Sequence, residues 1–290
     1  MSTIEKYVIP TDLAEAVRLL AEHDATLLAG GTDLMPRTRT GGMATAPLLV
    51  NLRKIPELRG ITTVDQRIRI GALTTVTEIL RDRTLRQAAA ILPETADCFA
   101  SDQVRNSATI GGNICNASPA GDLIIPLLLL DAELELASWV DGAVVRSSLP
   151  LSDFFVGPGQ TRLAATEILL AATFALPPPE RVAYFEKFGA RPALDISIVS
   201  VGIAGTRQNG SLHQVRVAFG AVAPTPLRGR QTEAFIEGQV YSEQFIGQAG
   251  RLAAEEVSPI TDVRATAWYR REMIRILTGR VLRHVLQTAY

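Results

Sequence analysis

Two glycine-rich stretches contain the residues most suited to binding a ligand. Residues 27–34 read LLAGGTDL and residues 109–113 read TIGGN, so each has a Gly-Gly pair beside a polar side chain. Glycine tolerates positive φ and lets a ligand approach the backbone closely. Successive N–H groups in such a turn form a concave anion site. Neither stretch contains Lys or Arg, so we expect both loops to bind one diphosphate through backbone N–H groups.

Other nucleotide-binding and catalytic motifs are absent. The sequence has no G-x-x-x-x-G-K-[ST], no Rossmann G-x-G-x-x-G and no G-x-S-x-G. Its three histidines, His23, His213 and His284, are far apart, and Cys98 and Cys115 are its only cysteines. Two thiols cannot alone complete a four-ligand zinc or iron–sulfur site. We therefore expect no metal in this chain, and the sequence offers no candidate catalytic residue.

Composition narrows the class of protein. The chain has 290 residues, a net charge of −1, 47% hydrophobic residues and 20% charged residues, which is typical of a globular protein. A nucleic-acid-binding protein is more often basic. The longest apolar run, LIIPLLLL at residues 123–130, is far shorter than the roughly 20 residues of a membrane span. The N-terminal residues carry charges where a signal peptide is apolar, so we expect a cytoplasmic protein.

The helices and strands that must position the two loops alternate at the N-terminus. Beyond it, a run of helices is followed by a run of strands. Residues 11–23 predict an amphipathic helix capped by Thr11, with strands at residues 25–31 and 47–52, which indicates a small α/β unit. A strand at residues 67–73 precedes helices broken near Pro93 and a long loop over residues 101–122. A buried helix follows, with Pro126 in its first turn. Three strands come next, in ELELAS, AVVRSS and EILLAATFAL.

A proline-rich stretch marks a boundary. Residues 176–181 read LPPPER, and three consecutive prolines join neither a helix nor a sheet ladder. Beyond it, Asn209-Gly210 predicts a type I′ hairpin, and helices are expected at residues 242–257 and 265–289. We therefore predict three parts: residues 1–60, residues 61–176, and a C-terminal α+β domain over residues 177–290 with an antiparallel sheet.

Five segments in a characteristic order identify a family. They are LLAGGTDLMP, IRIGALTTVTEIL, QVRNSATIGGNICNASPAGDLIIPLLLLDAELEL, EILLAATFALP and YRREMIRILTGRVL. Together they resemble the FAD-binding medium subunit of the molybdenum hydroxylases, the xanthine dehydrogenase and carbon monoxide dehydrogenase family, over residues 4–286. The resemblance implies an α+β chain with a vanillyl-alcohol-oxidase/PCMH-type FAD-binding domain in two subdomains, followed by the α+β C-terminal domain.

The resemblance also implies a cofactor and the residues that hold it. The two glycine loops would bind the FAD diphosphate through Leu27, Leu28, Ala29, Gly30, Gly31, Thr32, Asp33, Leu34, Thr109, Ile110, Gly111, Gly112 and Asn113.

Four further residues match family positions near the flavin. Phe99 would contact the flavin, or else lie in the core. Asp122 would bond the ribityl or ribose hydroxyls, or else cap the following helix. Leu169 would pack near the isoalloxazine, or else be plain core. Lys187 would favour the anionic reduced flavin, or else be a solvated strand lysine.

By the same resemblance, the chain is an electron-transfer subunit of an oxidoreductase. It would take electrons from a [2Fe–2S] cluster on a small subunit, which receives them from a molybdenum cofactor on a large subunit, in a dimer of heterotrimers. NAD, oxygen or a quinone would be the acceptor, although Pro158 stands where xanthine dehydrogenases have an aromatic residue near the nicotinamide. Two other functions stay open: a self-sufficient FAD-dependent oxidase or reductase, and a non-redox module for a phosphorylated ligand.

Overall fold

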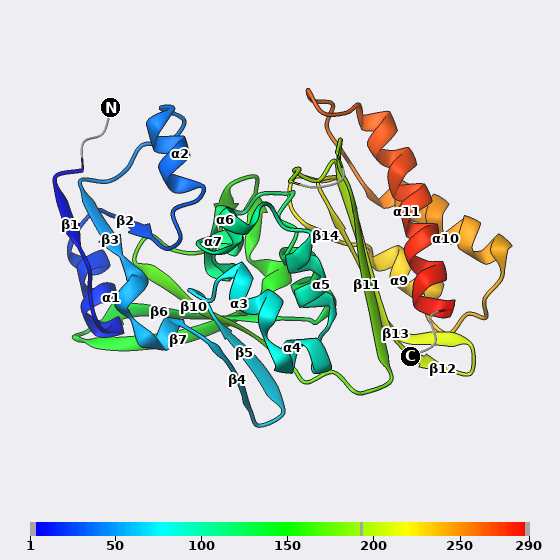
Figure 1. Ribbon diagram of the computed structural model, residues 1–290, viewed down its shortest axis with the longest axis horizontal. Coiled ribbons are helices and arrows are strands. Elements are labelled where there is room, and N and C mark those ends of the chain that lie inside the picture. The colour runs from blue at the N-terminus through cyan, green and yellow to red at the C-terminus, as the bar shows by residue number, and fades with distance from the viewer. Residues whose placement is uncertain (1–3, 192–193, 288–290) are drawn as a thin grey trace.

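The computed structural model describes residues 4–191 and 194–287. A three-stranded sheet lies at one end of the molecule, a C-terminal sheet with its helices lies at the other, and a five-stranded sheet lies between them (Figure 1). Each of these sheets falls within one of the three predicted parts. The bounds of those parts stay a prediction.

The N-terminal sheet is parallel and has the order β1-β3-β2. Its elements are β1 (Lys6–Val8), α1 (Leu13–Glu22), β2 (Ala25–Leu28), α2 (Leu34–Arg39) and β3 (Leu48–Asn51), followed by 3-10 turns η1 (Leu52–Lys54) and η2 (Pro56–Leu58). The predicted α/β unit is therefore present, with β1 and α2 in addition. The cap of α1 is Asp12, whose side chain accepts from the Glu15 N–H, and not Thr11.

The central sheet is antiparallel, with the order β4-β5-β10-β6-β7. Helix α1 packs on one face, where Val17 and Leu20 join Ile168 and Leu170 in one buried cluster. The opposite face carries the helices between β5 and β6. The strands are β4 (Ile61–Val64), β5 (Arg67–Gly71), β6 (Glu133–Val140), β7 (Ala143–Pro150) and β10 (Glu167–Ala175), with η3 (Leu151–Asp153) and the small pair β8 (Phe155–Gly157) and β9 (Gln160–Thr161) between β7 and β10.

The helices on that second face correct two predictions. Pro93 lies in the first turn of α5, where no intrahelical N–H is needed, so the helical break comes earlier, at Ala89 and Ala90. The expected long loop at residues 101–122 contains two short helices, α6 and α7. The predicted placement of Pro126 in the first turn of α8 is confirmed. The helices are α3 (Val76–Arg81), α4 (Arg83–Ala88), α5 (Ile91–Asp97), α6 (Asp102–Arg105), α7 (Ile110–Asn116) and α8 (Ile124–Leu129).

The C-terminal sheet is antiparallel, with the order β11-β12-β13-β14. Asn209 and Gly210 have φ of 49° and 80°, as the predicted type I′ hairpin requires. Helices α10 and α11 cover one face (Figure 1), and α8 packs on the other, close to Gly202 of β12. The elements are β11 (Arg181–Phe188), β12 (Val199–Gln208), β13 (Ser211–Gly220), β14 (Leu227–Arg228), α9 (Arg230–Ile236), α10 (Glu243–Glu256) and α11 (Ala267–Gln287).

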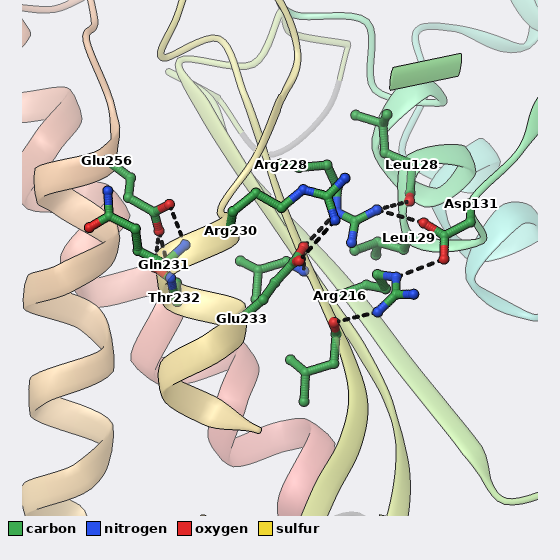
Figure 2. Close-up of polar contacts among 12 residues, drawn as sticks. Leu128, Leu129, Asp131, Arg216, Arg228, Arg230, Gln231, Thr232, Glu233 and Glu256 are labelled. Carbon is green, nitrogen blue, oxygen red and sulfur yellow. Dashed lines mark hydrogen bonds and ion pairs between the residues drawn. The ribbon is translucent and has the colours of Figure 1, made fainter. Parts of the chain in front are cut away.

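An ion-pair network joins the C-terminal sheet to the end of α8 (Figure 2). Asp131 accepts from Arg216 Nε at 2.7 Å and from Arg228 Nη1 at 2.6 Å. Arg228 also donates through Nε to Glu233, and its side chain is only 5% exposed. Because buried charges are stable only when paired, this network fixes the C-terminal domain against the helix that follows the second glycine loop.

Candidate cofactor-binding site

The structure brings the two glycine loops together. Gly30 and Thr109 both line a pocket of about 250 Å³. An ideal Cβ at Gly30 would lie 1.9 Å from the carbonyl oxygen of Ser107, so only glycine permits this approach of the two backbones. The prediction that one site is built from both loops therefore has a direct geometric basis.

The first loop offers a set of free donors. It follows β2, and Gly31 has a φ of +73°. Within the described residues, the N–H groups of residues 30–33 donate to no protein group. The Asp33 carboxylate is 3.4 Å from Arg37 Nη1, which also contacts Asn116 Oδ1 at 3.3 Å and so links α2 to α7. Four consecutive N–H groups without partners suit an anion.

The second loop differs from what we expected, because its N–H groups are largely occupied. Ile110 donates to the carbonyl oxygen of Thr74 at 3.0 Å, and Gly111 donates to that of Ala72 at 2.8 Å. Gly112 donates to Thr109 Oγ1 at 3.1 Å. These bonds attach the loop to the end of β5, and an ideal Cβ at Gly111 would clash with Ala72 at 2.7 Å. In this loop, therefore, glycine serves the packing of backbone on backbone.

One side chain of the second loop is still short of a partner. Asn113 Oδ1 is buried and makes no hydrogen bond. An unsatisfied buried polar atom costs free energy that a ligand can recover. Together with the free N–H groups of residues 30–33 and the pocket between the loops, this atom fits a bound polar cofactor.

Two arginines line the same pocket and were missed from the sequence. They are Arg53 in η1 and Arg59 just after η2, and no acidic residue lines the pocket with them. No local sequence pattern marked them, because their place depends on the parallel pairing of β2 with β3, whose carboxyl ends meet at one edge of the sheet. Residues just after the second strand therefore lie beside the loop that follows the first strand, where ligands of α/β sheets gather.

Asp122 and Lys187 meet, although 65 residues separate them in the chain. Lys187 Nζ lies 2.8 Å from Asp122 Oδ2 and 3.2 Å from the carbonyl oxygen of Asp195, and Ser197 donates to the other Asp122 oxygen. The two side chains are 13% and 7% exposed. The solvated alternative for Lys187 is therefore wrong. So is the capping alternative for Asp122, since Leu123 precedes α8 without any side-chain cap.

Burial and the Lys187 cation act on the pKa of the Asp122 carboxyl in opposite directions. Burial raises the pKa of Asp122, and the charge and hydrogen bond of Lys187, with that of Ser197, oppose the rise. Lys187 also lines a second pocket of about 600 Å³ together with Cys98, Arg105, Tyr184 and Glu186, among others. This pocket lies between α5, α6 and β11.

The other two predicted residues lie in or against the central core. Leu169 is buried in β10 within the main hydrophobic cluster, and Phe99 is partly buried against the same cluster. Neither lines one of the two pockets described above. The structure thus supports their core alternatives, and flavin contact stays a prediction for both.

Two features are absent from the part of the chain that the structure describes. No three His, Cys, Asp or Glu side chains come close enough to hold a metal ion. No described helix is long and apolar enough to cross a membrane.

Known proteins match nearly the whole length of the chain. The family model described as "FAD binding domain in molybdopterin dehydrogenase" matches residues 2–177, and the model "CO dehydrogenase flavoprotein C-terminal domain" matches residues 183–285. The xanthine dehydrogenase FAD-binding subunit of Escherichia coli O157:H7 is 34% identical over 281 residues, covering 96% of this chain and 94% of that protein. The carbon monoxide dehydrogenase medium chain of Hydrogenophaga pseudoflava is 28% identical, covering 98% and 96%.

The fold matches solved structures equally well. A chain of reconstituted CO dehydrogenase from Oligotropha carboxidovorans superposes with a TM-score of 0.93 at 28% identity, covering all of both chains. A chain of quinoline 2-oxidoreductase from Pseudomonas putida 86 gives 0.91 at 27% identity, covering 99% and 98%. The predicted α+β architecture, with its FAD-binding domain followed by an antiparallel C-terminal domain, is confirmed.

Proposed function

The chain belongs to the family of FAD-binding medium subunits of the molybdenum hydroxylases, and from this premise we propose how its residues hold the cofactor. As in its relatives, it is an FAD-binding electron-transfer subunit of an oxidoreductase. The observation that carries the proposal is the row of free N–H groups at residues 30–33, which lies beside the pocket shared with Thr109.

The diphosphate of FAD binds at the first loop. The N–H groups of residues 30–33 donate to its oxygens, and Gly31 supplies the positive φ that holds the turn. The predicted contacts of Leu27, Leu28, Ala29 and Leu34 come from the ends of β2 and α2 that frame this turn. Asn113, whose buried Oδ1 has no protein partner, binds a polar group of the cofactor.

The second loop, residues 109–112, acts mainly as a rigid wall. Its N–H groups donate to the carbonyl oxygens of residues 72 and 74. These bonds fix the position of the second loop opposite the first loop. Thr109 lines the pocket. Ile110, Gly111 and Gly112 do not line it, and they serve to hold the loop in place.

The flavin end lies toward the Asp122–Lys187 pair. Asp122 holds Lys187 in place, and Lys187 places a positive charge at the second pocket. Phe99 and Leu169 supply apolar contact to the ring. FAD itself, when bound, takes up and passes on electrons singly or in pairs. The protein binds the cofactor, orients it and places charge beside it.

The chain works within a larger assembly. Its relatives are named as subunits or chains of dehydrogenases, which supports a large molybdenum-cofactor subunit and a small [2Fe–2S] subunit as partners. We propose a dimer of heterotrimers, with NAD, oxygen or a quinone as the electron acceptor. Pro158, which stands where xanthine dehydrogenases have an aromatic residue, gives no support to NAD. Two free thiols, Cys98 and Cys115, support a cytoplasmic location. The parts at 1–60, 61–176 and 177–290 would be two FAD subdomains and the C-terminal domain.

The test is the visible absorption spectrum of the purified chain, followed by chromatography of the cofactor released by heat. A flavin spectrum and released FAD are the expected result. A folded chain that is colourless and takes up no added FAD would contradict the proposal. A self-sufficient oxidase is less favoured, and it predicts that a small-molecule substrate alone bleaches the flavin without partner subunits.

A further inference from the structure

The pocket between the two glycine loops carries an unbalanced positive charge. Arg53 and Arg59 are the only charged residues among those that line it; the others are Ala29, Gly30, Leu73, Thr75, Asn106, Ser107 and Thr109. Because neither glycine loop has a cation of its own, the charge comes wholly from the segment after β3.

Neither arginine is paired with an acidic side chain of the described residues, and Arg59 is held in place by a neutral group. Arg59 donates through Nε at 3.2 Å and Nη2 at 3.0 Å to the carbonyl oxygen of Arg53. This bidentate contact to a neutral group fixes the guanidinium and leaves Nη1 free. The Arg53 side chain makes no hydrogen bond or ion pair with any described residue.

Nearby acids are engaged elsewhere. Glu57 pairs with Arg146, and the Glu78 carboxylate accepts from the N–H of Thr75 at 2.6 Å and from its hydroxyl at 2.8 Å. Two guanidinium groups without an acidic partner line a pocket that Gly30 also lines, and this arrangement suits a doubly charged diphosphate.

We propose that Arg53 and Arg59 bind the diphosphate of FAD and supply the positive charge that the glycine loops lack. This inference rests on the proposed function, because it assigns residues to the same cofactor. The N–H groups of residues 30–33 orient the diphosphate, and the two arginines neutralise its negative charge. Binding of FAD should therefore depend on ionic strength, since exposed charge pairs are screened by salt.

Equilibrium titration of the apo chain with FAD, followed by quenching of flavin fluorescence, tests this at low and high salt. The variants are Arg53→Gln, Arg59→Gln and Arg59→Lys. The matched control is Arg86→Gln, because Arg86 also donates through Nε and Nη2 to a carbonyl oxygen six residues away, that of Leu80, at 3.1 and 3.0 Å. Arg86 lies in α4 and lines neither pocket.

We expect each glutamine variant to raise the Kd for FAD about tenfold at low salt, the lower end for a charge-assisted hydrogen bond. High salt should raise the Kd for FAD more in the wild type than in either glutamine variant. Arg59→Lys should raise the Kd for FAD less than Arg59→Gln does. The Kd of Arg86→Gln should stay within about twofold of the wild-type value. Circular dichroism and thermal midpoints establish that each variant is folded.

Two results would overturn the inference alone. In one, both glutamine variants bind FAD as tightly as the wild type. In the other, they bind more weakly but keep the salt dependence of the wild type, so that the arginines shape the pocket without pairing with phosphate. A wild-type chain that binds no FAD under any condition would instead overturn the proposed function, and this inference with it.

Discussion

Substituting Gly30 with alanine should damage the cofactor site and the fold together. The added Cβ would lie 1.9 Å from the carbonyl oxygen of Ser107 and 2.7 Å from its carbon, whereas real Cβ atoms essentially never come closer than 3.0 Å. The obstacle is backbone, so it cannot be relieved by a change of rotamer. The two loops must therefore separate by about 1 Å, which typically costs about 1–3 kcal/mol for overpacking.

The same displacement moves the free N–H groups of residues 30–33 away from the pocket. A loss of about 1.4 kcal/mol in binding is a tenfold rise in Kd, so we expect FAD affinity to fall at least tenfold. Urea unfolding of the apo chain measures the first effect and fluorescence titration with FAD measures the second. The control is Gly42→Ala, whose Cβ would meet nothing closer than 3.7 Å. A Gly30→Ala chain with wild-type stability and wild-type Kd would refute the reasoning.

Two further predictions concern charges outside the cofactor site. Arg228→Met removes the buried cation of Glu233 and leaves only the exposed Arg230, 3.4 Å away, so it should lower the free energy of unfolding by about 3 kcal/mol in urea; an unchanged midpoint would contradict this. Burial raises the pKa of Asp262, but hydrogen bonds from the Arg264 N–H and the Arg270 guanidinium outweigh it and lower the pKa to about 2. A carboxyl group with a lowered pKa stabilises the fold above its ordinary pKa and loses that contribution as the pH falls through about 2. The stability difference between wild type and Asp262→Asn should therefore shrink below about pH 4, and a difference that grows would contradict the assignment.

Local signals were sufficient for elements whose residues determine their own geometry. The hairpin at Asn209-Gly210 needs two residues with positive φ, and Pro126 fits only the first turn of α8. The amphipathic spacing of α1 likewise identified its buried face. These features depend on a few neighbouring residues, so the sequence contains all the information required.

The two helices that were not predicted from the sequence, α6 and α7, lack such a local signal. Helices α6 and α7 have four and seven residues, too short for a hydrophobic period, and α7 contains the Gly111-Gly112 pair that disfavours a helix. They form because Ser101 and Thr109 cap them and because Thr74 and Ala72 accept N–H bonds from the second loop. Those acceptors lie more than thirty residues away in the sequence, beyond the reach of local patterns.

The candidate site was predictable in its residues and less so in their roles. The two glycine loops do meet, yet the closeness of Gly30 to Ser107 shows that one glycine serves backbone packing as much as ligand approach. The contribution of Arg53 and Arg59 depends on the parallel pairing of β2 with β3. Pairing of strands that are distant in sequence cannot be deduced from either strand alone.

The central claim, that this chain relays electrons through FAD, is tested most directly by stopped-flow absorbance. The FAD-loaded chain is mixed, in the absence of oxygen and of any small-molecule substrate, with the reduced [2Fe–2S] subunit of its own complex. The account predicts that the flavin absorbance bleaches as the iron–sulfur absorbance returns, at a rate at least equal to turnover of the complete complex. A flavin that stays oxidised in that mixture, but bleaches with a small-molecule substrate alone, would contradict the account and identify a self-sufficient oxidase.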